Sequence, residues 1–128
     1  MPPFGRNTEP APLSMTVDRS EPDAPLIRVG GDLAYRTATP LRDEIDRILA
    51  GTPPELLLDF ADLRFIDSTG LGVIVHAWRE SQSGGTVIRL RAVPRFLEAI
   101  LDMTGISGLL ARPVEARPDT AELPAAPA

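Results

Sequence analysis

The residues best suited to chemistry in this sequence are Asp67, Ser68 and Thr69, which directly follow a short apolar stretch. An amphipathic run from about Thr69 to Ser83 comes next, which predicts that these three residues open a helix. The simplest interpretation is structural, because an Asp, Ser or Thr at a helix start caps it and is worth about 1 kcal/mol. The same position suits a phosphate, since free N–H groups and the helix dipole stabilise an anion there.

Two glycines at the start of this helix favour a functional interpretation. Gly70 and Gly72 each cost roughly 0.5–1 kcal/mol relative to Ala in a helix. Helical spacing places Gly72, His76 and Arg79 on one face, and we expect that face to approach another protein closely. The expected core stripe lies on the opposite face at Leu71, Ile74, Val75 and Trp78.

A hydrolytic enzyme is the first alternative, and the residue types argue against it. The sole histidine, His76, stands eight residues after Ser68 on the same predicted helix, too far along it to take the Ser68 proton. A single histidine on a helix flank is more often simply solvated. Asp59, Asp62 and Asp67 lack EF-hand spacing, so we interpret Asp59 as a strand end and the other two as turn caps. We therefore expect no enzymatic activity, no metal and no cofactor.

Composition narrows the possible partners. The 128 residues suffice for one domain, and 18 acidic against 13 basic residues give a net charge of −5. Such an acidic chain is poorly suited to nucleic acid or to an anionic membrane. All basic residues are Arg, which indicates a bacterial source with GC-rich DNA. We find no signal peptide and no apolar run of the roughly 18 residues that a membrane span needs, so we expect a cytoplasmic protein.

Proline marks both ends of the predicted domain. Eight of the 14 prolines fall in residues 2–12 and 113–127. We expect flexible tails at residues 1–12 and 116–128, with the folded domain at residues 13–115.

The sequence of the first half of that domain predicts two strands and a helix. Leu13, Met15 and Val17 alternate with polar residues, and a second strand begins at Leu26 and ends at the glycine pair 30–31. The helix begins with Thr39 as N-cap and Pro40 as its first residue, and Asp43 can pair with Arg47 on its exposed face. Its expected core stripe consists of Leu41, Ile45, Ile48 and Leu49.

Strands and helices alternate from there to the end of the domain. Leu56–Phe60 is a short strand that is buried on both faces, and Thr86–Leu90 is the strand after the helix that Ser68 opens. Pro94 begins the last predicted helix, and Gly105 is its C-cap. The pattern predicts an α/β fold with right-handed crossovers.

The segment around Ser68 resembles the signature of the STAS domain of bacterial anti-sigma factor antagonists. The resemblance is carried by F-I-D-S-T-G-L-G-V-I-V, preceded by L-L-L-D-F-A-D-L. Similar segments of the family match G-D-L-A-Y-R-T-A at Gly31–Ala38 and A-V-P-R-F-L-E-A-I-L-D-M-T-G-I at Ala92–Ile106, so the likeness spans roughly residues 13–110. It implies a single α/β domain with a mixed central sheet of about 4–5 strands and 3–4 helices.

The resemblance also implies a function. In this family an anti-sigma factor that is itself a serine kinase phosphorylates the Ser of this motif, here Ser68, and a serine phosphatase of the PP2C type is the second partner. Thr69 is the second choice of acceptor. The resemblance and the helix face together give the expected partner-binding residues, which are Asp32, Asp67, Ser68, Thr69, Gly70, Gly72, His76 and Arg79.

The chain departs from the family pattern in two places. Ala34 stands where many members carry an Asp that is associated with partner contact. Arg112–Ala128 contains four prolines where a final strand and helix are common, so any last helix is short and near Thr120–Leu123.

Two other functions fit parts of this sequence. A phospho-receiver domain, suggested by L-L-L-D-F with an acceptor at Asp59, resembles a fold that requires a late lysine, and this chain has none. STAS modules also resemble subunits of lipid-transport complexes and sensory scaffolds, in which Ser68 would never be phosphorylated. Gene neighbours distinguish this last alternative from the antagonist.

Overall fold

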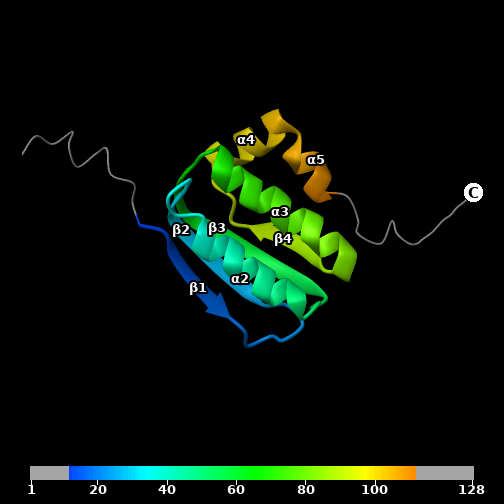
Figure 1. Ribbon diagram of the computed structural model, residues 1–128. Helices are drawn as coiled ribbons and strands as arrows, with labels where there is room; N and C mark the ends of the chain where they lie inside the picture. Colours follow the sequence, from blue (N-terminus) through cyan, green and yellow to red (C-terminus); the bar gives the residue numbers. More distant parts are fainter. Residues whose placement is uncertain (1–11, 112–128) are drawn as a thin grey trace, which may run out of the picture.

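A mixed sheet of four strands forms the centre of the computed structural model, which describes residues 12–111 (Figure 1). The strands lie in the order β1-β2-β3-β4; β1 and β2 are antiparallel, and the other two pairs are parallel. The strands are β1 (Ser14–Asp18), β2 (Leu26–Leu33), β3 (Glu55–Ile66) and β4 (Val87–Arg91). The helices are α2 (Thr39–Ala50), α3 (Ser68–Gly84), α4 (Arg95–Thr104) and α5 (Ile106–Ala111). The predicted α/β class and mixed sheet are confirmed.

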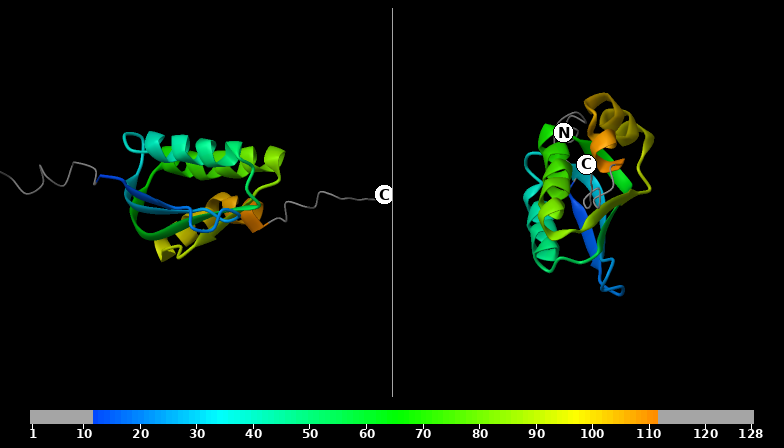
Figure 2. Two further views of the ribbon diagram at one scale, coloured as in Figure 1. Left: turned by 90° about the horizontal axis from the view of Figure 1, so that it is seen from below. Right: turned by 90° about the vertical axis from the view of Figure 1, so that its right-hand side faces the viewer.

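Helices cover the two faces of the sheet unequally. Figure 2 shows α2 and α3 side by side on one face, with α4 and α5 toward the other face near β4. Each of the parallel pairs β2–β3 and β3–β4 is joined through a helix, α2 and α3 respectively. The helices α2 and α3 therefore start from the edge at which β2 and β3 end.

The hydrophobic core contains residues of the sheet and of this helix pair, together with Leu97, Leu101 and Ile106 of α4 and α5. Leu56, Leu58 and Phe60, which share one face of β3, are fully buried. On the opposite face Asp59 is buried and Leu57 is half-buried, so the predicted burial of both faces is only partly confirmed. The predicted stripe of α2 is also confirmed, because all of its members are buried: Leu41, Ile45, Ile48 and Leu49.

Two strands are longer than the sequence pattern indicated. The glycine pair 30–31 does not end β2, which continues to Leu33, and β3 continues past Phe60 to Ile66. Gly31 has a φ of +80°, and the register shifts on both sides of the pair, so these glycines form an irregularity within the strand. As a result Leu33 lies opposite Ile66 at the C-terminal ends of the two strands.

The helix α3 begins and ends within one residue of the prediction but is rotated about its axis. Its buried residues are Gly70, Val73, Ile74, Ala77 and Ser81. Of the predicted core stripe, only Ile74 is fully buried, whereas Leu71, Val75 and Trp78 are partly exposed. Gly70 lies against Leu33, which leaves no room there for a larger residue, while Leu71 and Val75 still pack against the core as partly buried residues.

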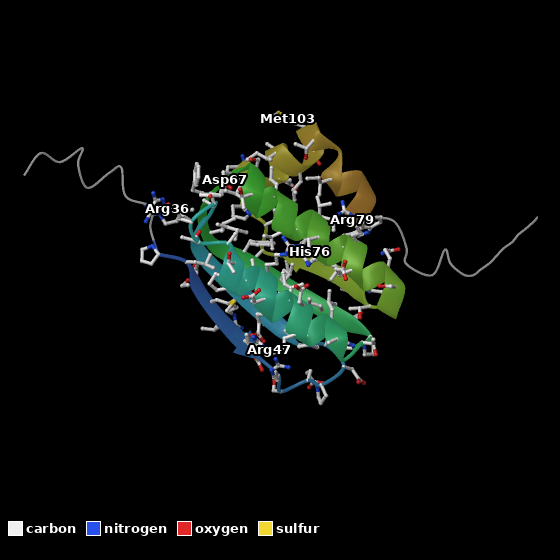
Figure 3. The ribbon with its side chains drawn as sticks, viewed as in Figure 1. Arg36, Arg47, Asp67, His76, Arg79 and Met103 are labelled. Carbon is white, nitrogen blue, oxygen red and sulfur yellow. The ribbon has the colours of Figure 1, made fainter. Side chains whose placement is uncertain are left out.

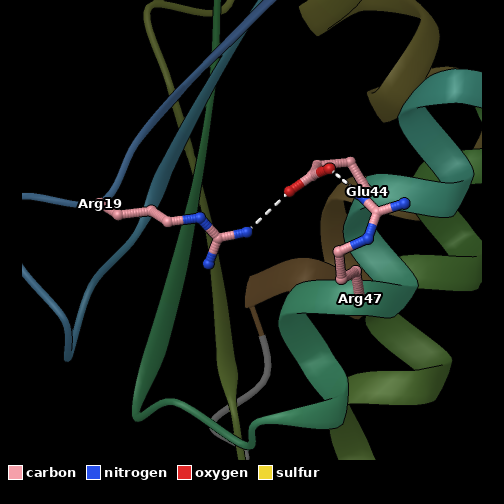
Figure 4. Close-up of polar contacts among 3 residues, drawn as sticks. All are labelled: Arg19, Glu44 and Arg47. Atoms are coloured by element: carbon pink, nitrogen blue, oxygen red, sulfur yellow. Dashed lines mark hydrogen bonds and ion pairs between the residues drawn. The ribbon is translucent and has the colours of Figure 1, made fainter.

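The start and the exposed face of α2 also differ from the prediction. The N-cap is Ala38, without a side-chain hydrogen bond, and Thr39 is already helical. Arg47 pairs with Glu44 instead of Asp43, and Glu44 also accepts a hydrogen bond from Arg19 at 2.8 Å (Figure 4). The ion pair of Arg19 with Glu44 thus joins the segment after β1 to α2, whereas that of Arg47 lies within the helix.

The C-terminal part contains one helix that the sequence pattern did not reveal. Gly105 ends α4 with a φ of +81°, which confirms it as the C-cap, and α5 follows at once. The last helix expected near Thr120–Leu123 and the tails at residues 1–11 and 112–128 lie outside the described residues.

Candidate functional site

The start of α3 separates the helix cap from the candidate phosphate acceptor. Asp67 is the N-cap, and its Oδ1 accepts a hydrogen bond from the Gly70 N–H at 2.9 Å. Ser68 and Thr69 are exposed, and within residues 12–111 the Ser68 side chain makes no hydrogen bond. The capping interpretation therefore applies to Asp67 and leaves the Ser68 hydroxyl available for chemistry.

Asp67 also connects α3 to the β2–α2 loop, which consists of residues 34–38. Its Oδ2 accepts from the Tyr35 N–H at 3.0 Å, and its own N–H donates to the Leu33 carbonyl oxygen at 3.3 Å. Figure 3 shows Arg36 and Asp67 at the same end of the molecule. The loop thus lies beside the Ser68 turn, although the two are more than 30 residues apart in the sequence.

Hydrogen bonds within the β2–α2 loop close it into a compact turn. The Ala34 N–H donates to Thr37 Oγ1 at 3.0 Å, and the Ala34 carbonyl accepts from the Thr37 and Ala38 N–H groups, both at 2.9 Å. The Thr37 hydroxyl donates to the backbone carbonyl of Asp32, which places Asp32 at the base of this turn. Tyr35 at its tip is 79% exposed.

Gly70 and Gly72 have different roles. Gly70 is buried, and a Cβ built on it would lie 2.2 Å from the Leu33 carbonyl oxygen. Its lack of a side chain lets α3 pack on the end of β2, so partner approach is not what requires this glycine. Gly72 is exposed, and a Cβ there would meet nothing within 4 Å, so it belongs to the accessible surface of α3.

His76 faces another helix and is not at the Ser68 turn. Its Nε2 lies 2.7 Å from Asp46 Oδ1 of α2, and its side chain is 15% exposed, so it is not the freely solvated histidine that the sequence suggested. It lines an open groove of about 480 Å³ between α2 and α3 together with Asp46 and Glu80. Arg79 is exposed farther along α3 (Figure 3). Neither residue is near Ser68, since eight helical residues span about 12 Å.

The structure therefore brings together only some of the predicted partner-binding residues, and it adds two residues of the β2–α2 loop to them. Asp67, Ser68 and Thr69 lie beside the turn that begins at Asp32, whereas His76 and Arg79 are separate from them. Sequence reasoning missed Tyr35 and Arg36 as surface residues of this site. The available signal was a large aromatic residue next to an Arg in a predicted loop.

The carboxylates weighed as metal ligands are not assembled for that purpose. Asp59 does not end a strand: it lies within β3, nearly buried, where it accepts hydrogen bonds from Arg91 Nε at 3.1 Å and from the Ala61 N–H at 2.9 Å. Among residues 12–111, no group of three His, Asp or Glu side chains could hold a metal ion. No helix in this part of the chain is long and apolar enough to cross a membrane.

Comparisons with known proteins found one matching family and several similar sequences. A family model described as "Mlab, STAS domain" matches residues 16–111. The anti-sigma F factor antagonist of Paenibacillus polymyxa is 28% identical over 82 residues, which cover 63% of this chain and 70% of that protein. The anti-sigma-B factor antagonist of Bacillus subtilis (strain 168) is 26% identical over 98 residues, which cover 77% of this chain and 88% of that protein.

One solved structure with the same fold was determined in a modified state. It is the Bacillus cell fate determinant SpoIIAA in the phosphorylated form, with a TM-score of 0.61 at 18% identity. The match covers 88% of this chain and 91% of that one.

Proposed function

The chain belongs to the STAS domain family, and from that membership we propose that it is an anti-sigma factor antagonist that phosphorylation of Ser68 turns off. In this proposal the unmodified protein binds an anti-sigma factor serine kinase in the cytoplasm, and the sigma factor is released. No contact with nucleic acid or membrane is part of this cycle.

A covalent step then ends the interaction. The kinase transfers the γ-phosphoryl group of ATP to Ser68 Oγ, with ADP as leaving group and the hydroxyl proton passing to a base of the kinase. A serine phosphatase of the PP2C type hydrolyses the phosphoserine to serine and inorganic phosphate, and the antagonist is active again.

The observation that carries the proposal is the division of tasks between Asp67 and Ser68. Asp67 caps α3, so modification of Ser68 does not remove the helix cap. Its exposed hydroxyl stands at a helix N-terminus, where a phosphate is electrostatically tolerated. Phosphorylation is therefore expected to change the surface of the protein without unfolding it.

The same phosphate would interfere with a bound partner. It adds about −1.5 to −2 charges beside the Asp67 carboxylate, where a fitted partner would have to desolvate both groups. A loss of about 3 kcal/mol, or roughly a hundredfold in affinity, is a reasonable size for this effect.

Binding of the anti-sigma factor kinase to substituted proteins tests the proposal. We expect Ser68→Ala to bind as the wild type does, and Ser68→Asp to bind roughly a hundredfold more weakly while staying folded. Ser83→Asp is the matched control, because Ser83 is an exposed serine at the other end of α3. Equal binding by Ser68→Asp and Ser83→Asp would contradict the proposal.

A second candidate is a STAS subunit of a lipid-transport or sensory complex in which Ser68 stays unmodified. Ala34 supports this second candidate, because many members of the family carry an Asp at this position in the loop beside Ser68. Ala34 contributes only backbone hydrogen bonds there. A fold shared by several functions does not decide between them. A neighbouring gene for an ATPase of the histidine-kinase type or for a serine phosphatase favours the antagonist, and transporter genes favour the second candidate.

A further inference from the structure

Asp67 uses both oxygens of one carboxylate to join two backbone segments. Oδ1 accepts from the Gly70 N–H at 2.9 Å within α3, and Oδ2 accepts from the Tyr35 N–H at 3.0 Å in the β2–α2 loop. Hydrogen bonds to a carboxylate are stronger than those between neutral groups. The Asp67 side chain therefore links the tip of the loop to the turn that carries Ser68.

Among residues 12–111, few other contacts hold the tip of the loop in this place. The Tyr35 side chain is 79% exposed, and Arg36 is exposed as well, so packing contributes little at these two positions. Within residues 12–111, the other hydrogen bonds of the loop join it to the end of β2, to the start of α2 or to itself, and none connects its tip to α3. In the described part of the chain, the hydrogen bond from Tyr35 to Asp67 thus joins the tip of the loop to the turn, while the bond from the Asp67 N–H to the Leu33 carbonyl joins the end of β2 to it.

We infer that Asp67 is a positioning residue, which holds the β2–α2 loop against the Ser68 turn so that Tyr35 and Ser68 form one contact surface for the partner. As far as the partner is concerned, this inference rests on the proposed function. Asp67 acts here through the backbone of Tyr35, and its own carboxylate is occupied by the two N–H groups.

The substitution Asp67→Asn separates this role from helix capping. Asn is as good an N-cap as Asp, and its side-chain oxygen can still accept from Gly70. Its NH₂ group cannot accept a hydrogen bond, so the bond from Tyr35 is lost while the helix cap is kept. The matched control is Asp43→Asn, which makes the same change of charge at an exposed position of α2.

Amide hydrogen exchange on the full chain measures the link without any partner. In Asp67→Asn we expect the Tyr35 amide to exchange at least about tenfold faster than in the wild type, whereas the Gly70 amide changes by less than about threefold. Asp43→Asn should leave both amides unchanged. An unchanged exchange rate of the Tyr35 amide in Asp67→Asn would overturn the inference.

Binding to the anti-sigma factor kinase then tests the contact surface. We expect Asp67→Asn and Tyr35→Ala each to weaken binding about tenfold, and the double variant to be little weaker than either, because both changes disrupt the same surface. Wild-type affinity of Asp67→Asn, with the Tyr35 amide exchanging faster, would overturn the role in binding. If the wild type itself does not bind the kinase, the proposed function fails, and the exchange rates still decide whether Asp67 positions the loop.

Discussion

Asp67 and Ser68 are neighbours in the sequence, and their side chains have separate tasks in the structure. The carboxylate caps α3 and holds the β2–α2 loop, while the hydroxyl stays exposed. The sequence predicted a helix start at this point but allowed any of three polar residues to be the cap. Only the backbone geometry decides among them, since Asp67 has the extended conformation of an N-cap and Ser68 is already helical.

Gly70 and Gly72 provide a matched pair of substitutions at this helix start. Gly70→Ala should destabilise the protein by about 1–3 kcal/mol, because the new Cβ would overlap the Leu33 carbonyl. Gly72→Ala should be neutral or stabilise it by up to about 1 kcal/mol, because the site is open and Ala favours a helix. Urea unfolding of both variants measures the difference, and equal stabilities would contradict the packing of α3 on β2.

Asp18, at the end of β1, provides a test by pH. Hydrogen bonds from the Ser20 side chain and N–H, and to a smaller extent the charge of Arg28, hold the pKa of its carboxyl below the usual 3.8. A lowered folded-state pKa contributes stability that is present above the unfolded value and is lost as the pH falls through the folded one. The thermal midpoint of the wild type should therefore exceed that of Asp18→Asn near neutral pH. This difference should shrink below pH 3.8, and a constant difference would contradict the assignment.

At the scale of elements, α3 shows what a hydrophobic pattern determines and what it does not. The pattern predicted the bounds of the helix closely, because apolar spacing and the flanking glycines mark them. It placed the centre of the inward face too close to Trp78, because bulky residues outweigh Gly70 and Ala77 in any count of hydrophobicity, although Ile74 is in the core and Leu71 and Val75 pack against it. Close packing on β2 requires small residues, and that requirement appears only when the neighbouring strand is known.

The rotation of α3 changes the expected cost of replacing its side chains. Ile74→Ala should cost about 2–5 kcal/mol, because Ile74 is fully buried. Trp78→Ala should cost less than Ile74→Ala, although the core position first predicted for Trp78 implied about 3–5 kcal/mol. Chemical denaturation of the two variants ranks them, and a larger loss for Trp78→Ala would contradict the observed face of the helix.

The strands β2 and β3 show a second limit of sequence reasoning. The glycine pair in β2 and the exposed Ala61 and Asp62 in β3 interrupt the apolar runs, so the pattern predicted early ends. Register shifts within the β2–β3 pair allow both strands to continue. That extension carries Leu33 and Ile66 to the same end of the sheet, which is what places the β2–α2 loop next to Ser68.

In the molecule as a whole, the alternation of strands and helices was predictable from the sequence. The surface that the β2–α2 loop and the Ser68 turn form together was not. Turn residues and hydrophobic spacing are local signals, and they identified the helices α2, α3 and α4 and the order of the elements. The contact between Tyr35 and Asp67 spans 32 residues and depends on β2 and β3 being parallel neighbours. The pairing of His76 with Asp46 also joins two separate elements, α3 and α2, so it could not be predicted from the sequence of either helix alone.

The domain boundaries can be tested by truncation. The buried apolar residues of the described chain lie between Leu26 and Ile106, so we expect residues 13–115 to fold alone. Their thermal midpoint should stay within about 4–8 °C of the full chain, the shift that a loss of 1 kcal/mol produces in a domain of this size. A chain that ends at Gly105 is the control, because it lacks Ile106 and α5 and should be clearly less stable. Loss of cooperative unfolding in the longer chain would contradict these boundaries.

Mass spectrometry of the phosphorylated protein determines whether Ser68 accepts the phosphate. The full-length protein is incubated with the anti-sigma factor kinase and ATP, alongside Ser68→Ala and Thr69→Ala. We predict one phosphate on Ser68 in the wild type and in Thr69→Ala, and none in Ser68→Ala. Phosphate on Thr69 or on another residue, or equal labelling of Ser68→Ala, would contradict the account.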